Sequence, residues 1–350
     1  MERIQNLHVK SIQNLPSPQS LRKKFPVGVT AKQTVLDSRK TISNILEKRD
    51  KRLLLIAGPC SIHDPKSALE YAKRLNELKE EMKDSFFVLM RTYFEKPRTT
   101  IGWKGFINDP YMDESCDMAY GLEKAREILL SLANMGLPSA AETLDPITIN
   151  YISDLLSWVS IGARTVESQP HRELASGLSM PVGFKNNTSG EIKVAIDAIV
   201  SARQPHSFLG VNEKGEVSIV RTKGNPFGHL ILRGGSNSPN CDPKNVESAT
   251  NALSERNLSQ TIIIDCSHGN SRKKQHNQIS ICKDIVSQRV AGSKNIVGIM
   301  LESNLFDGSQ KIPKDLTNLQ YGVSVTDECM GWTDTEKLLR ETYRAVSSHL

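Results

Sequence analysis

The sequence has few cysteines, and none of them lie in a close pair. Its 350 residues contain six cysteines, with no CxxC motif among them. A secreted scaffold held by disulfides needs a dense set of paired cysteines, so this composition excludes that class of protein. Sparse, unpaired cysteine favours a reducing compartment, and we expect the protein to be cytoplasmic.

Long apolar runs are also missing. No hydrophobic stretch reaches the length of about 18 residues that a membrane-spanning helix needs. The chain opens on the polar residues MERIQN, and no long apolar segment follows them. A secretory signal peptide would have such a segment, so we expect neither a signal peptide nor a membrane span.

Charge of one sign is not concentrated in any segment. The chain carries 45 Lys and Arg against 39 Asp and Glu, a formal net charge of +6. The cations are spread along the chain, and no basic segment is interleaved with aromatic residues, which make up 5% of the sequence. Nucleic-acid binding is therefore not expected.

The chain does contain a regular alternation of short apolar runs and longer segments of helical period. The expected strands are residues 53–57, 86–90, 138–141, 158–161, 182–184, 229–232, 261–264 and 296–301. The expected helices between and after them are residues 65–82, 115–134, 146–156, 171–176, 191–203, 243–255, 279–291 and 334–348. Eight such units predict an α/β fold, the (β/α)8 TIM barrel. An open doubly wound sheet fits eight units less well, and the sequence lacks its GxGxxG fingerprint.

Two segments fall outside this repeat. Residues 1–45 are polar and interrupted by prolines, and we expect an N-terminal arm before a catalytic barrel over 46–350. A helix over 31–47 ends the arm. Residues 207–221 hold two apolar runs around a polar, Gly-containing turn, which predicts a β-hairpin inserted into the barrel. Asp-Pro pairs at 64–65, 145–146 and 242–243 predict capped helix starts.

Every expected strand is followed at its end by a polar, ionisable or metal-ligating residue. In order these residues are Cys60, Arg91, Glu142, Arg164, Lys185, Arg233, His268 and Glu302. The carboxyl ends of TIM-barrel strands meet at one face, where active sites are built. If these residues were placed by chance, some of the eight strands would end without one. We therefore expect an active site at this face.

Four of the expected residues have the chemistry of metal ligands. Cys60, His268 and Glu302, with Asp327 from the loop after the last strand, offer a thiolate, an imidazole and two carboxylates. This mixed donor set suits a divalent ion such as Mn²⁺, Fe²⁺, Co²⁺ or Zn²⁺ better than Mg²⁺. Taken alone, Cys60 could equally be a small buried apolar residue, and His268 a polar residue with ordinary hydrogen bonds.

A second group is cationic. Its members are Arg91, Lys96, Arg98, Arg164, Lys185 and Arg233. Arg and Lys facing one mouth would repel one another without a ligand, so a substrate with more than one anionic group is implied. The stretch 96–100, with two hydroxyls beside two cations, is a candidate second phosphate site; a solvated charged face is its ordinary alternative.

With these residues the chain resembles the microbial class I 3-deoxy-D-arabino-heptulosonate-7-phosphate (DAHP) synthases, from about residue 35 to residue 348. The matching strings are AGPCSIHD at 57–64, RTYFEKPRTT at 91–100, IGART at 161–165, PVGFKN at 181–186, LRGG at 232–235, DCSHGN at 265–270 and ESN at 302–304. The resemblance implies a metal-dependent homotetramer that condenses phosphoenolpyruvate with erythrose 4-phosphate and releases inorganic phosphate.

The resemblance also assigns residues to roles. It implies metal ligation by Cys60, His268, Glu302 and Asp327. It implies phosphoenolpyruvate binding by Arg91, Lys96, Glu142, Ala163, Arg164, Lys185 and Arg233, and erythrose 4-phosphate binding by Lys96, Pro97, Arg98 and Thr99. Lys96 is the expected proton donor to the new hydroxyl, and either Glu142 or a water on the metal directs water to the second carbon of phosphoenolpyruvate.

In this family an aromatic amino acid inhibits the enzyme, and the resemblance implies an effector site here. The implied residues are Pro146, Asn150, Leu174, Ser179, Phe208, Gly210 and Val220. Pro146 and Gly210 favour tyrosine as effector, although Ile149 departs from the residues usual there; an arm that only builds the oligomer is the alternative. Two other functions are alternatives. The string KPRT at 96–99 argues against a related synthase using arabinose 5-phosphate, and the complete set of metal-ligating and cationic residues argues against a barrel kept only to bind an amino acid.

Overall fold

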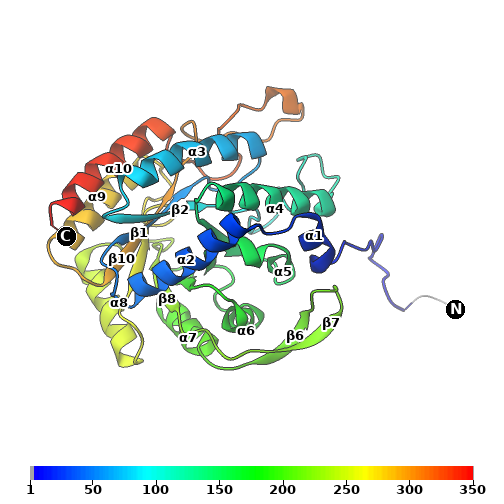
Figure 1. Ribbon diagram of the computed structural model, residues 1–350, viewed down its shortest axis with the longest axis horizontal. Helices are drawn as coiled ribbons and strands as arrows, with labels where there is room; N and C mark the ends of the chain where they lie inside the picture. The colour runs from blue at the N-terminus through cyan, green and yellow to red at the C-terminus, as the bar shows by residue number, and fades with distance from the viewer. Residues whose placement is uncertain (1–3, 350) are drawn as a thin grey trace.

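The chain folds into a closed barrel of eight parallel strands surrounded by helices (Figure 1). The computed structural model describes residues 4–349. The barrel strands are β1 (Leu53–Gly58), β2 (Phe86–Arg91), β3 (Ser139–Thr143), β4 (Trp158–Ile161), β5 (Val182–Lys185), β8 (Gly228–Leu232), β9 (Ile262–Asp265) and β10 (Ile296–Glu302). Each coincides with one expected apolar run.

The sheet closes because β1 pairs with β2 on one side and with β10 on the other. Ile56 lies opposite Leu89 in β2 and opposite Met300 in β10. Every pair of neighbouring barrel strands is parallel. The predicted TIM barrel is therefore confirmed, and the open sheet is excluded.

Helices cover the outside of the barrel. They are α2 (Val29–Leu46), α3 (Pro65–Glu81), α4 (Met118–Asn134), α5 (Ile149–Ile152), α6 (Gln169–Gly177), α7 (Lys193–Ala202), α8 (Pro243–Glu255), α9 (Asn277–Val290) and α10 (Trp332–Ser347). Within residues 4–349, none of the helices has the length and apolar character required to cross a bilayer.

Two of the three predicted helix starts are confirmed. Asp64 and Asp242 each accept two backbone hydrogen bonds from the first turn of α3 and α8, with proline next in the chain. At Asp145 the carboxylate accepts from the same two positions, the backbone N–H of Ile147 at 2.7 Å and of Thr148 at 3.3 Å. It therefore caps a turn at 146–148, and the regular helix α5 begins at Ile149, three residues later than predicted.

The barrel interior is filled by one of the two alternating faces of each strand. Leu54 and Ile56 of β1 belong to the interior cluster, whereas Leu53 and Leu55 belong to the core between strands and helices. The last turn of α2 joins the interior cluster through Ile42, Ile45 and Leu46. The last turn of α2 therefore packs against the interior at the amino-terminal end of the barrel strands. The division of the chain into an arm and a barrel at residue 45 stays a prediction.

The same alternation decides what reaches the mouth of the barrel. In a strand, the residue two positions after an interior side chain also points into the barrel. In five strands and directly after β8 this position is charged: Arg91, Glu142, Lys185, Arg233, Asp265 and Glu302. All of these side chains are buried except that of Glu142, which is half-buried. The apolar interior thus ends in a layer of charged side chains at the carboxyl end of the strands.

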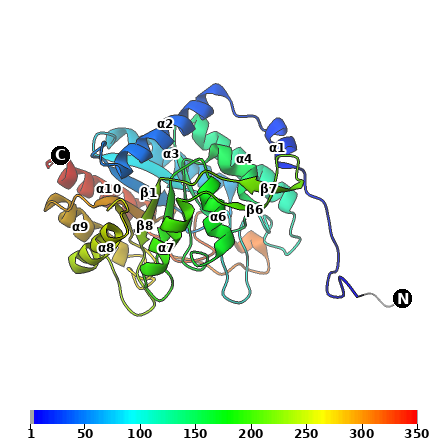
Figure 2. The same ribbon diagram turned by 90° about the horizontal axis from the view of Figure 1, so that it is seen from below.

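Two segments extend from the barrel. Strands β6 (Ser207–Val211) and β7 (Val217–Arg221) form the predicted antiparallel hairpin, separate from the barrel sheet. Figure 2 shows the hairpin beside helix α6 and the N-terminal segment leading away from the body of the protein. Helix α1 (Pro18–Lys24) lies near the hairpin, since the backbone N–H of Gln19 donates to the carbonyl of Glu213 at 2.8 Å.

The tight interior packing around β5 predicts a stability effect. A Cβ atom on Gly183 would lie 2.5 Å from Ile231 and 2.6 Å from Trp158. We expect Gly183→Ala to lower the free energy of unfolding by about 1–3 kcal/mol, because overpacking forces neighbouring side chains out of place. Denaturant unfolding measures this. Gly28→Ala is the control, since no atom lies within 4 Å of its added methyl group; equal stability of both variants would contradict the predicted clash.

Candidate active site

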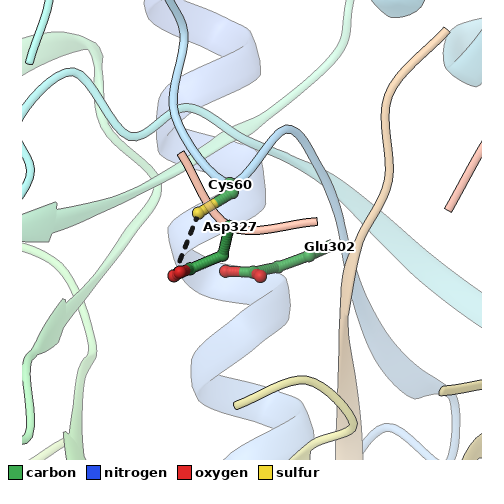
Figure 3. Close-up of side chains that lie close together, drawn as sticks. All are labelled: Cys60, Glu302 and Asp327. Carbon is green, nitrogen blue, oxygen red and sulfur yellow. Dashed lines mark hydrogen bonds between the residues drawn. The ribbon is translucent and has the colours of Figure 1, made fainter. Parts of the chain in front are cut away.

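Three potential metal ligands converge at the mouth of the barrel. The donor atoms of Cys60, Glu302 and Asp327 all lie within 4.8 Å of one another (Figure 3). Cys60 follows β1, Glu302 ends β10, and Asp327 comes from the loop before α10. The fourth expected ligand is adjacent, with Nε2 of His268 3.7 Å from Oε1 of Glu302. The structure thus brings the four residues together, while their role as ligands stays a prediction.

A buried arginine holds the backbone that presents Cys60. The Arg91 guanidinium donates to the carbonyl of Pro59, to that of Cys60 at 2.6 Å, and to Glu302 at 2.9 Å. The strands also approach closely here, since a Cβ on Gly58 would lie 2.6 Å from the Arg91 carbonyl oxygen. Glycine permits this contact, and Arg91 then fixes the sulfur-bearing turn relative to the carboxylate.

A lysine ammonium lies among these ligands. Nζ of Lys96 is 2.7 Å from Sγ of Cys60 and 3.1 Å from Oδ2 of Asp327. Burial would lower the pKa of Lys96, but the negative charges of Cys60 in its thiolate form and of Asp327 raise it overall. Burial, with help from Glu302, raises the pKa of Cys60 to about 11. The pKa of Asp327 is held well below its usual range, chiefly by Lys96.

The donor set fits a divalent cation of the borderline class. One sulfur, one imidazole nitrogen and two carboxylates match Mn²⁺, Fe²⁺, Co²⁺ or Zn²⁺ in donor type. The acceptors of Cys60 and Asp327 already converge on a positive charge, the ammonium of Lys96. A second trio, His276, Asp307 and Asp334, is more exposed and offers no sulfur.

A cavity of about 240 Å³ opens above this cluster. It is lined by every residue expected to bind substrate: Arg91, Lys96, Pro97, Arg98, Thr99, Glu142, Ala163, Arg164, Lys185 and Arg233. His268 and Asp327 also line it, whereas Cys60 and Glu302 are buried beside it. Candidate metal ligands and candidate anion-binding groups therefore share one cavity.

Carboxylates balance the cations in this cavity. Nζ of Lys185 lies 3.4 Å from Oε2 of Glu142 and 3.4 Å from Oδ2 of Asp265. Burial would raise the pKa of Glu142, but Lys185 and Lys96 lower it overall. Glu142 is therefore ionised at neutral pH, and Lys185 keeps its proton.

An asparagine network positions the next cation. Oδ1 of Asn186 accepts from the backbone N–H of Arg233 at 2.8 Å and from Nδ2 of Asn240 at 3.1 Å. Oδ1 of Asn240 in turn accepts from the N–H of Gly234 at 2.7 Å. These bonds fix the chain after β8, so the Arg233 side chain reaches the cavity from a rigid backbone.

Sequence reasoning missed several residues of the cavity. Tyr93 lies under two cations, with the Arg91 guanidinium 3.6 Å and Nζ of Lys185 5.6 Å from its ring centre. Thr188 and Lys273 also line the cavity. Asp265 was missed although a signal existed, because it occupies the inward position two residues after Ile263 in β9. His268, three residues later, was taken as the end of that strand.

A second cavity, of about 650 Å³, lies between the hairpin and helices α5 and α6. All seven residues expected at the effector site line it: Pro146, Asn150, Leu174, Ser179, Phe208, Gly210 and Val220. Helix α1 connects two of its walls, since Arg22 donates to the Asn150 carbonyl and to Glu213 of the hairpin turn, both at 2.8 Å.

Two curated relatives are similar along nearly the whole chain. The Tyr-sensitive phospho-2-dehydro-3-deoxyheptonate aldolase of Escherichia coli (strain K12) is 49% identical over 347 residues, which cover 99% of this chain and 97% of that protein. The Phe-sensitive enzyme of the same organism is 51% identical over 343 residues, covering 98% and 97%. The two identities are nearly equal, so the preference for tyrosine stays a prediction.

A solved structure is also similar. The phospho-2-dehydro-3-deoxyheptonate aldolase of Francisella tularensis SCHU S4 matches with a TM-score of 0.95 and 47% identity, covering 98% of this chain and 99% of that one. The family model described as DAHP synthetase I family matches residues 25–340. On this match and the two relatives, this chain belongs to the DAHP synthetase I family.

Proposed function

We propose that the chain is a DAHP synthase. It condenses phosphoenolpyruvate with D-erythrose 4-phosphate and water to give 3-deoxy-D-arabino-heptulosonate 7-phosphate and inorganic phosphate, the first step of the shikimate pathway. One observation supports this most strongly. Seven Arg and Lys side chains line a single cavity, and a mixed sulfur, nitrogen and oxygen donor set lies in and directly beside it, as a metal-assisted reaction between two anionic substrates requires.

Phosphoenolpyruvate carries a phosphate and a carboxylate, and the cations at or just after the ends of β4, β5 and β8 suit both groups. Arg164 and Arg233 offer planar forks for these anions, and Lys185 offers a point charge. Arg91 contributes less directly. Three of its five N–H groups are already donated to Pro59, Cys60 and Glu302, so two remain for a ligand.

The segment 96–99 suits the phosphate of the second substrate. Nε of Arg98 donates to the carbonyl of Trp103 at 2.9 Å, which holds the loop and leaves the terminal guanidinium nitrogens free for phosphate. Thr99 adds a hydroxyl beside them, and Pro97 stiffens the backbone. Lys96, the first residue of this segment, also lies against the metal ligands Cys60 and Asp327, so it contacts both substrates in the proposed complex.

Cys60, His268, Glu302 and Asp327 would hold the divalent ion. When bound, the ion supplies Lewis acidity that polarises the aldehyde of erythrose 4-phosphate. The buried cations around the cavity fix the third carbon of phosphoenolpyruvate against that aldehyde. The chain's own residues therefore bind and orient the two proposed substrates, and this accounts for the specificity for them.

Two residues move protons. Lys96 carries a proton because its pKa is raised, and it lies beside the metal ligands, so it is placed to donate that proton to the aldehyde oxygen as the new carbon–carbon bond forms. Glu142, which Lys185 and Lys96 keep ionised, accepts a proton from the water that attacks the second carbon of phosphoenolpyruvate. Phosphate then leaves from that carbon. We assign the base role to Glu142 because its carboxylate lines the cavity.

The second cavity is proposed to bind an aromatic amino acid as feedback inhibitor. Leu174, Phe208 and Val220 give it apolar walls for an aromatic ring, and Asn150 and Ser179 offer polar groups for the amino-acid end. The names of the two E. coli relatives record sensitivity to tyrosine and to phenylalanine, which supports the proposal.

The protein is further proposed to be a homo-oligomer, a tetramer, with a second copy covering its exposed apolar segments. Leu7 is 65% exposed and Ile12 78% exposed on the N-terminal segment. On the hairpin Leu209 and Val217 are each 78% exposed. Apolar side chains clustered on two extended segments favour an interface.

The activity itself is the first test. Purified protein with Mn²⁺ should release inorganic phosphate from phosphoenolpyruvate only when erythrose 4-phosphate is present, and product should accumulate in equal amount. Replacing the aldehyde with arabinose 5-phosphate should give little product, since the segment 96–99 suits the shorter substrate. A phosphate assay measures both reactions. No release with erythrose 4-phosphate would refute the proposed function.

The ligand assignment predicts the effect of removing the thiol. Cys60→Ala should lose most of its bound metal and lower kcat by more than about 100-fold. The variant removes a proposed metal ligand, and even the loss of a residue that only supports a ligand lowers metal affinity or activity about 10- to 100-fold. Metal analysis of the purified variant and steady-state kinetics measure the two effects. Cys116→Ala is the matched control because Cys116 is exposed. Full metal occupancy in Cys60→Ala would show that the sulfur is not a ligand.

The arm has a testable part in both assembly and inhibition. Deleting residues 1–12 should reduce the solution mass below that of a tetramer and weaken inhibition by the aromatic effector about tenfold or more, a loss of about 1.4 kcal/mol. Light scattering and inhibition curves with each of the three aromatic amino acids measure this.

Gly210→Val separates the two effects of that deletion. A Cβ on Gly210 would lie 2.7 Å from Val220, so the larger side chain should block the second cavity and abolish inhibition while the mass stays unchanged. A truncated protein with wild-type mass and full inhibition would contradict the role of the arm.

A further inference from the structure

Asp265, the last residue of β9, is a buried carboxylate without a role in the proposed reaction. It is 1% exposed. Its Oδ1 accepts from the Ser267 backbone N–H at 3.0 Å and from the Ser267 hydroxyl at 2.6 Å. Its Oδ2 is buried without a hydrogen bond of good geometry, and lies 3.0 Å from Nδ1 of His268 and 3.4 Å from Nζ of Lys185.

Both groups that face Nδ1 of His268 are hydrogen-bond acceptors. The Ser267 hydroxyl lies 2.6 Å from Nδ1, but its single hydrogen is directed to Asp265. A carboxylate has no hydrogen to donate. In the neutral ring the proton must therefore sit on Nδ1, and the lone pair belongs to Nε2, which is the nitrogen on the side of Glu302 at 3.7 Å.

The backbone of His268 is also constrained. Its φ of 54° lies in the left-handed region, which is strained for a residue other than glycine. The conformation is held by the N–H of Lys273, which donates to the His268 carbonyl at 2.8 Å, and by the Ser271 hydroxyl at 3.2 Å. A ring placed at such cost beside one carboxylate indicates that its orientation matters.

We propose that Asp265 is a positioning residue that fixes His268 in the Nδ1–H tautomer, so that Nε2 presents its lone pair to the divalent ion before the ion arrives. The inference rests on the proposed function through the assignment of His268 as a ligand. Carboxylates that accept from a ligating histidine orient the ring and strengthen the metal bond. Asp265 also contacts Lys185, so one side chain joins the metal ligand to a substrate cation.

Glu142 provides a matched comparison. Its carboxylate lies at the same 3.4 Å from Nζ of Lys185 as that of Asp265, but no ion pair joins it to His268. If Asp265 acted only by neutralising Lys185, then Asp265→Asn and Glu142→Gln would have the same effect on metal binding. If it positions His268, only Asp265→Asn weakens the metal site.

Two readouts test the proposal without measuring activity. Metal-free protein labelled with ¹⁵N-histidine, at pH 9, should show the His268 proton on Nδ1 in two-bond ¹⁵N–¹H spectra, with His268→Ala assigning the resonance. Asp265→Asn should move part of that proton to Nε2 and weaken Mn²⁺ binding about 10- to 100-fold by electron paramagnetic resonance. Glu142→Gln should change neither.

Each contrary result has one meaning. A proton on Nε2 in the wild-type protein would overturn the proposal even if Asp265→Asn did not fold. Equal loss of Mn²⁺ affinity in Asp265→Asn and Glu142→Gln would overturn it as well, because the effect would then run through Lys185. Unchanged Mn²⁺ affinity in His268→Ala would instead refute the ligand assignment, which belongs to the proposed function.

Discussion

The pairing of buried charges at the mouth of the barrel is the constraint on which the site depends. Taking an ion out of water costs several kcal/mol unless a partner compensates it. Arg91 is paired with Glu302 at 2.9 Å, Lys96 with Asp327 at 3.1 Å, and Lys185 with Glu142 at 3.4 Å. Cations that suit anionic substrates and carboxylates that suit a metal ion therefore stabilise one another in the protein alone.

The same pairs also set geometry. Arg91 comes from β2, but its guanidinium bonds the turn after β1 and the end of β10, so one side chain spans three neighbouring strands at the closure of the barrel. The parallel register places Gly58 opposite Glu302, which brings the thiol and the carboxylate to the same edge. Rigid strands and buried pairs together hold the site with little freedom.

The two cavities are in physical contact through one segment. Glu95 directly precedes Lys96, and its buried carboxylate accepts from the Thr148 hydroxyl at 3.3 Å, in the turn before α5. Burial, with the nearby Asp145, raises the pKa of Glu95 to about 8. The turn at 145–148 contributes Pro146 to the second cavity, so the segment that supplies Lys96 to the mouth of the barrel also touches a wall of that cavity.

The sequence by itself indicated the fold, because eight apolar runs alternating with helices match a closed parallel barrel with helices outside better than an open doubly wound sheet. It also indicated residues of the cavity at the barrel mouth, since strand ends meet at one face, whereas the residues of the second cavity came from the family resemblance. Only the tertiary structure decided which side chains contact one another, because spacing along the chain does not determine these contacts. It placed Lys96 2.7 Å from Cys60, used three donors of Arg91 inside the protein, and put Asp265 against His268. These contacts join residues from different strands or around a tight turn, so they depend on barrel register and on the left-handed backbone at His268.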